Sequence, residues 1–236
     1  MTSFFEVVLG MLTPLLLVVL GVFVLVPFMR GRYIARLNQV GQQIAEAGNY
    51  VVEDSPAKVF GYSFQKVLRI KRPRGDIMFV EHEGSKNVPA YTLLFLHLPI
   101  VSSFSFSREG VLNRLGKQLT LAREIEIGRS DLDDAFFLSV EDEVHGRNLL
   151  AQPEMTEALV QLLDFASFER LLGATRQRTD SRHIELVELE FREGLSLRFS
   201  GLLKQQSGHQ LARAFEILDS VAEAVRKTGS ATTARA

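Results

Sequence analysis

The chain has 236 residues, a formal net charge of −1 and a sequence pI of about 6.5. This balance lacks the strongly basic character that usually accompanies nucleic-acid binding, so we expect no nucleic-acid partner. The chain contains no cysteine, which excludes disulfides, thiol nucleophiles and cysteine-ligated metal sites.

An uncharged apolar segment runs from Val7 to Phe28. As a helix it would be about 33 Å long, which matches a hydrocarbon core about 30 Å thick. No basic residue precedes the segment and no small-residue cleavage site follows it, which argues against a cleaved signal peptide. The sequence therefore predicts a single transmembrane helix over residues 4–29.

Basic and aromatic residues follow this segment at once. Arg30, Arg32 and Arg36, with Tyr33 among them, are typical of a membrane-interface anchor that places the ring among the headgroups and the guanidinium groups on phosphates. Glu6 lies on the other side of the segment. The positive-inside rule then predicts an inner (plasma) membrane protein with its N-terminus outside and the rest of the chain in the cytoplasm.

The remaining chain divides into three parts by pattern. Apolar residues spaced by three or four positions predict a juxtamembrane helix over residues 30–49, which Gly48 and Asn49 end. Residues 50–226 alternate strand and helix patterns without a long linker, which predicts one cytoplasmic α+β domain with a largely antiparallel sheet packed against helices. The small and polar residues 227–236 predict a disordered tail.

Strand patterns dominate the first half of the domain. Four of them, at residues 64–71, 76–83, 90–100 and 104–107, are joined by short turns, which predicts an antiparallel meander. Further strands are predicted at 124–127, 135–140, 183–191 and 194–201, and helices at 108–120, at 152–166 and from His209 onward. The last helix is predicted to bury Leu211, Phe215, Leu218, Val221 and Val225.

Two groups of carboxylates flank the predicted strand 135–140. Such oxygen ligands could hold Ca²⁺ or Mg²⁺, but the glycine and glutamate positions of a calcium loop are missing. The strand would also separate the two groups by about 20 Å, and a catalytic acid–base pair would require burial that turns do not provide. The pattern favours solvated turns over a metal site. The groups are Asp131, Asp133 and Asp134, then Glu141, Asp142 and Glu143.

No motif for catalysis or for a cofactor is recognised. The five histidines do not share a helix at metal-ligand spacing, and the chain has no G-x-S-x-G elbow and no glycine-rich phosphate loop. We therefore expect no cofactor and no metal. His97 falls in an apolar strand, where a hydrogen-bonded structural histidine is the favoured interpretation over a ligand.

Basic residues crowd the turn between the first two strands of the meander. Close to a bilayer they could contact anionic headgroups, at about 1 kcal/mol for each charge. A solvated edge hairpin is the alternative, because strand edges often carry lysine, and an acidic partner or nucleic acid is the third. This basic hairpin consists of Lys66, Arg69, Lys71, Arg72 and Arg74.

The stretch from Glu124 to Leu163 resembles uncharacterised bacterial membrane-anchored proteins. Their motif, roughly D-I-x-[TI]-G-D-x-x-[FL]-D-x-x-F-x-[VL] followed by a leucine pair, is similar to this chain at Ile125, Ile127, Gly128, Leu132, Asp133, Phe136 or Phe137, and Leu149–Leu150. The chain departs from it at Glu126 and Ser130. The likeness covers residues 60–225 and implies an α+β domain, a structural turn at Asp133 and no catalytic residue.

These observations predict an interaction or scaffold module, tethered to the lipid bilayer and meeting an unidentified protein partner there. Two other functions stay open: a membrane-tethered enzyme, and a domain that contacts lipid headgroups through the basic hairpin. A cleft that holds two or more of His97, His145, Asp133 and Glu141 would favour the enzyme, whereas a filled core with polar residues scattered outward would favour the module.

Overall fold

The computed structural model describes most of the chain, which divides into two compact units, residues 1–42 and 43–236, treated separately below. The described residues are 13–14, 17, 19–48, 50–54, 58–60, 63–65, 67–82, 84, 89–108, 123–175, 193–201 and 208–233.

The described residues of the N-terminal unit are helical. A short π-helix, η1 (Gly21–Leu25), leads into α2 (Val26–Gly48), which ends at Gly48 as predicted. Within the described residues, no helix combines the length and the apolar character that a membrane span requires. Much of the predicted span, residues 4–12, 15, 16 and 18, lies outside the described residues.

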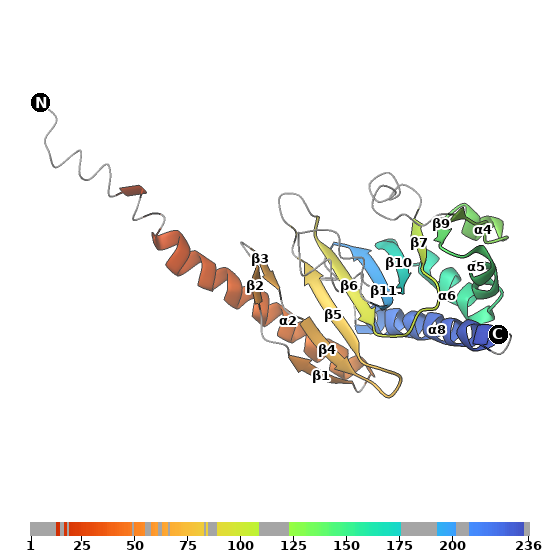
Figure 1. The fold of residues 1–236 in the computed structure, drawn as a ribbon. Helices are drawn as coiled ribbons and strands as arrows, with labels where there is room; N and C mark the ends of the chain where they lie inside the picture. Colours follow the sequence, from red (N-terminus) through yellow and green to blue (C-terminus); the bar gives the residue numbers. More distant parts are fainter. Residues whose placement is uncertain are drawn as a thin grey trace, which may run out of the picture. The chain divides into compact units, whose positions relative to one another are not determined.

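A nine-stranded sheet forms the centre of the second unit (Figure 1). Every neighbouring pair in it is antiparallel, which confirms the predicted α+β class. In spatial order the strands are β1 (Val51–Asp54), β4 (Val67–Lys71), β5 (Ile77–His82), β6 (Tyr91–Leu96), β11 (Gly194–Ser200), β10 (Phe168–Ala174), β7 (Phe104–Arg108), β9 (Phe136–Val140) and β8 (Arg123–Glu124). A separate hairpin joins β2 (Lys58–Phe60) to β3 (Ser63–Gln65).

The predicted meander is only partly correct. Strands β4, β5 and β6 pair in sequence, but β7 pairs with β10 and β9 instead of β6. Two strands from late in the chain, β11 and β10, lie between β6 and β7. Their side chains are almost all buried, as expected for strands at the centre of a sheet. Strand β10 was not predicted. The helix predicted at 108–120 is wrong at Arg108, which ends β7. Its other residues and the strand predicted at 183–191 lie outside the described residues.

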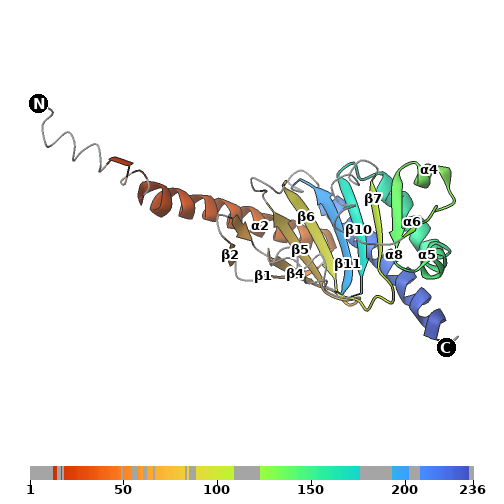
Figure 2. The same ribbon diagram turned by 45° about the horizontal axis from the view of Figure 1, so that its top comes forward.

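Besides the end of α2, the described residues of the second unit include the helices α4 (Ser130–Asp133), α5 (Glu143–Leu150), α6 (Pro153–Leu163) and α8 (Gly208–Thr233). Helix α8 lies along the sheet, with α5 and α6 packed beside it (Figures 1 and 2). All five side chains predicted to form its apolar face are buried. Aromatic pairs join the layers, such as Phe165 with Phe199, whose ring centroids are 5.5 Å apart.

Helix α8 continues to Thr233, so the prediction of a disordered tail from residue 227 is wrong for residues 227–233. A hydrogen bond within the helix and an ion pair with α6 accompany the extension. The Thr228 side chain is buried and its hydroxyl donates to the Ala224 carbonyl at 2.9 Å. Lys227 pairs with Glu154 at the start of α6. Residues 234–236 lie outside the described part of the chain.

Candidate functional site

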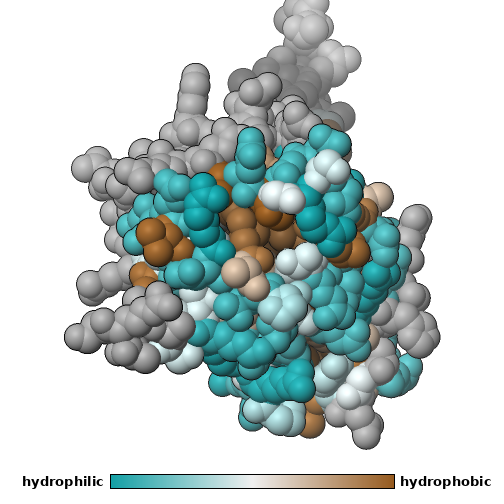
Figure 3. All heavy atoms as spheres, turned by 90° about the vertical axis from the view of Figure 1, so that its right-hand side faces the viewer, coloured by the Kyte–Doolittle hydropathy of each residue, from teal (hydrophilic) through white to brown (hydrophobic). Residues whose placement is uncertain are grey.

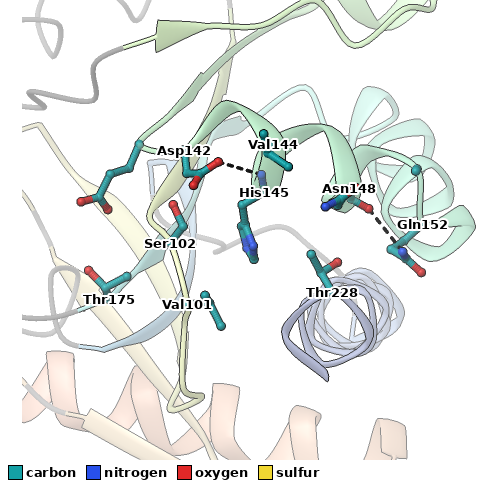
Figure 4. A pocket seen from close by; sticks show the side chains of 11 residues that line it. Val101, Ser102, Asp142, Val144, His145, Asn148, Gln152, Thr175 and Thr228 are labelled. Atoms are coloured by element: carbon teal, nitrogen blue, oxygen red, sulfur yellow. Dashed lines mark hydrogen bonds between the residues drawn. The ribbon is translucent and has the colours of Figure 1, made fainter. Parts of the chain in front are cut away.

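A polar pocket opens where the loop between β6 and β7, the segment after β9, and helix α8 meet (Figure 4). Its volume is about 720 Å³, within the range of about 300–1,000 Å³ usual for small-molecule sites. Two exposed valines, Val101 and Val144, and Ala151 lie among its lining residues, and hydroxyl, amide, carboxyl and imidazole groups supply the rest. The polar groups used below are Ser102, Glu141, Asp142, His145, Thr175 and Thr228.

The surface around this end of the domain is mainly polar. Figure 3 views the side that carries α4 and α5, and hydrophilic side chains there surround a small hydrophobic patch. The pocket is thus set in a solvated surface.

Helix α5 forms one wall, at a position where the sequence favoured a solvated turn around Glu141, Asp142 and Glu143. That prediction is wrong because Asp142 acts as an N-cap: its side chain accepts from the His145 backbone N–H at 2.9 Å. Gly146 lowers the helix propensity but is needed for packing, since a Cβ there would lie 2.8 Å from Val140 Cγ1. The cap turns His145 inward, and its side chain is only 7% exposed.

The His145 ring has no hydrogen-bond partner in the described part of the chain, and its Nε2 atom is fully buried. Burial lowers the pKa of His145 below its usual value, and the negative charge of Asp142 offsets this only in part. A buried imidazole nitrogen without a partner is costly for the folded state. The ring lies in the pocket wall (Figure 4), and a rotation of the side chain that exposes Nε2 would let a ligand there supply the missing hydrogen bond.

Ser102 is the second polar side chain with an unmet hydrogen bond. It is 7% exposed, and its hydroxyl oxygen is buried without a partner. The neighbouring Ser103 ties the loop down: its backbone N–H donates to Glu141 Oε2 at 3.1 Å, and its hydroxyl shares a 3.1 Å hydrogen bond with Thr175. The loop is thereby fixed on two sides, so Ser102 holds its place in the pocket wall.

The charge of the pocket is negative. Glu141 and Asp142 contribute carboxylates on the exposed side, and no lysine or arginine is present among the lining residues that the structure describes. Asp142 and Glu141 each use one oxygen for a backbone N–H. Their second oxygens have no hydrogen bond among the described residues, which leaves acceptors for a ligand.

This arrangement of side chains is suited to binding a ligand. A serine nucleophile needs a base within hydrogen-bond reach, and a histidine base is usually oriented by a third group. Neither hydrogen bond exists at Ser102 or at the His145 ring among the described residues. The side chains present can donate to and accept from a polar ligand and offer it negative charge.

The sequence identified only part of this pocket. His145 and Glu141 were among four residues whose meeting in a cleft would favour an enzyme, and both line it. The other two lie elsewhere: Asp133 accepts from the backbone N–H groups of Ile127 and Gly128, and His97 bonds the Glu193 carbonyl at 2.9 Å. Ser102, Thr175 and Thr228 carry no sequence signal, because strand pairing and α8 packing bring them to the pocket.

The acidic groups around β9 have local partners. Asp131 pairs with Arg129 at 2.6 Å and Glu143 with Arg147 at 2.9 Å, while Asp133 and Asp142 cap backbone N–H groups. In the described ranges, no three histidine, aspartate or glutamate side chains are placed to hold a metal ion.

The basic hairpin is largely neutralised by its own domain. Arg69 pairs with Asp76 and Lys71 with Glu53, each at 2.6 Å. Arg72 is not available to lipid, because its side chain is 4% exposed and both terminal nitrogens donate to Asp219 on α8 at 2.9 Å. Arg74 is exposed and lies 3.9 Å from the same Asp219. Lys66 lies outside the described residues.

The predicted membrane-interface anchor residues differ in how exposed they are. Arg30 and Arg32 are exposed, and the Arg32 guanidinium lies 5.6 Å from the Phe28 ring centroid. Tyr33 is 2% exposed, and its predicted place among the headgroups stays a prediction. The Arg36 guanidinium lies over that buried ring at 5.6 Å.

We expect His145 to make the stability of the domain depend on pH. Its pKa is lower in the folded protein than the usual unfolded value of about 6.5. At pH values between the folded and unfolded pKa, the unfolded chain binds more protons than the folded chain. The free energy of unfolding therefore increases as the pH rises through this interval and decreases as the pH falls. Urea unfolding of the full chain between about pH 5 and pH 8 measures this slope. His145→Gln should flatten it, and His97→Gln, which leaves His145 in place, should retain the His145 contribution. An unchanged slope in His145→Gln would contradict the assignment.

No protein-family model, curated protein or solved structure matches the chain, so its resemblance to bacterial membrane-anchored proteins stays a prediction.

Proposed function

We propose that the chain is a single-pass membrane-anchored interaction module, whose folded domain meets a protein partner at the bilayer surface. The observation that carries the proposal is a series of exposed apolar side chains on the described helical residues 17 and 19–29. Phe23 is 74% exposed, Leu17 64%, and Phe28 and Met29 59% each. Apolar side chains gathered in this way usually contact a membrane or another protein, and hydrocarbon would cover them.

The side of the membrane follows from charge. The exposed Arg30 and Arg32 come directly after the apolar residues, and positive charge next to a span favours the cytoplasmic side. A tether confines the domain to a thin layer and raises its effective concentration for partners at the same surface. The sheet, with its helices packed on it, supplies a rigid body for such contacts.

The orientation is tested with single cysteines, since the chain has none of its own. Ser230 is exposed on α8, and Ser3 precedes the apolar segment. With an impermeant maleimide on bacterial cells whose outer membrane, where present, has been opened, Ser3→Cys should be labelled. Ser230→Cys should be protected until the inner membrane is permeabilised.

Both variants should stay with the membrane fraction through a carbonate wash. Release of the chain by that wash would overturn the membrane anchor. Labelling of Ser230→Cys in intact cells together with protection of Ser3→Cys would reverse the orientation and leave the anchor in place.

A membrane-tethered enzyme is the second candidate, and one observation favours it. His145 and Glu141, two of the four polar residues singled out from the sequence, line the same pocket. The two functions differ in one observable: an enzyme changes the covalent structure of the ligand that it binds, whereas a module releases it unchanged. Contact of the basic hairpin with lipid has less support, because Arg72 is buried against Asp219.

A further inference from the structure

We propose that the His145 pocket binds a small polar ligand through a primary ammonium group. The inference goes beyond the proposed function, since the pocket lies wholly within the second unit and requires no membrane. It starts from two buried polar atoms, His145 Nε2 and Ser102 Oγ, that have no partner in the described structure.

These two atoms can accept hydrogen bonds, and the nearby carboxylates favour a positively charged donor. The His145 side chain is more than nine-tenths buried and lies in the pocket wall (Figure 4). Burial favours the neutral ring, and a neutral imidazole nitrogen can accept a hydrogen bond. Ser102 Oγ also accepts, and Glu141 and Asp142 add negative charge. An ammonium group has three donors and one positive charge, which suits this set of acceptors.

The same lining residues exclude other ligand classes. No lysine or arginine among the described lining residues could neutralise a phosphate or carboxylate, which would face two carboxylates of like charge. No aromatic side chain lines the described pocket, so the ring cage that recognises quaternary ammonium ions is missing. A bare metal ion lacks a group of three suitable side chains in the described residues.

The pocket is larger than an ammonium group. The Thr175 and Thr228 hydroxyls and the Asn148 and Gln152 amides line the remaining space. Such groups match the hydroxyls of a small polyol. The ligand class is therefore a small hydroxylated primary amine, such as an amino sugar or amino alcohol.

Glucosamine is the probe, and the full chain in detergent micelles with ¹⁵N-labelled histidine is the sample. The imidazole signals report binding directly, and the signal missing from His145→Gln identifies His145. Glucosamine should shift the His145 signal with a Kd on the order of 1 mM, as expected for a ligand of this size. N-acetylglucosamine, which keeps the ring but loses the charge, and the anion glucuronate should bind at least about tenfold more weakly.

Two variants distinguish the effect of a lost pocket charge from a general effect of substitution on the structure. Glu141→Gln keeps a carbonyl oxygen that can still accept from Ser103 N–H but removes the charge, so we expect about tenfold weaker glucosamine binding. Glu157→Gln, an exposed residue on α6 outside the pocket, is the matched control and should bind as the natural chain does. Equal or tighter binding of N-acetylglucosamine or glucuronate, or no shift of the His145 signal at about 50 mM glucosamine, would overturn the proposal.

Discussion

Replacement of Asp219 by alanine is expected to lower the free energy of unfolding of the domain by about 3–4 kcal/mol. Asp219 on α8 accepts two hydrogen bonds of 2.9 Å from Arg72, whose side chain is 4% exposed. The guanidinium also lies 5.8 Å from the Phe215 ring centroid, within the layer between α8 and the sheet. Without Asp219 this buried charge has lost its counter-ion, and the desolvation cost of the arginine is no longer offset. Urea unfolding of the full chain, followed by circular dichroism because the chain has no tryptophan, measures the loss.

A second ion pair of the same hairpin provides the control. Lys71 and Glu53 are 2.6 Å apart, but both side chains are nearly half exposed. Because water and salt screen such a pair, Glu53→Ala should cost less than about 1 kcal/mol. The double variant Arg72→Met with Asp219→Leu should recover most of the stability, since apolar side chains of similar volume often replace a buried pair without loss. Equal effects of Asp219→Ala and Glu53→Ala would contradict the burial argument.

Local periodicity correctly predicted the elements that are determined by residues close together in the sequence. The apolar face of α8, the helix that begins at Pro153 and the hairpin of β4 and β5 follow from spacings of two to four residues and short turns. The order of the sheet could not be obtained in this way. β11 pairs with β6 across about a hundred residues, and nothing in the short β7 sequence indicates that β10 and β9 are its neighbours.

Contacts between side chains that lie far apart in the sequence could not be predicted either. Arg72 was grouped with four other cations because they are adjacent in sequence, but its partner Asp219 is 147 residues away. The pocket gathers Ser102, His145 and Thr228 from three distant segments. Sequence identified the histidine because the residue type is rare and reactive, whereas serine and threonine are too common to single out.

Gly194→Ala is the second substitution with a large expected effect, about 3–5 kcal/mol of lost stability. Gly194 begins β11, which lies between β6 and β10. Its φ of +151° belongs to a region that residues with a Cβ rarely adopt. The new Cβ would also lie 2.4 Å from the Leu96 carbonyl oxygen and 2.9 Å from the Phe95 ring. The carbonyl belongs to the adjacent strand β6, so relief of this contact requires displacement of a strand pair at the centre of the sheet.

Gly201→Ala is the comparison for this loss, because it has the cost of a positive φ without a new contact. Gly201, just after the other end of β11, also has a positive φ, +71°, but a Cβ there would meet no atom within 4 Å. Its substitution carries only the backbone cost, about 1–2 kcal/mol. The difference between the two variants therefore combines the contact with β6 and the larger backbone strain at φ +151°, and urea midpoints of the full chain measure it. Equal losses in Gly194→Ala and Gly201→Ala would mean that β11 does not approach β6 this closely, and would contradict the position of β11 between β6 and β10.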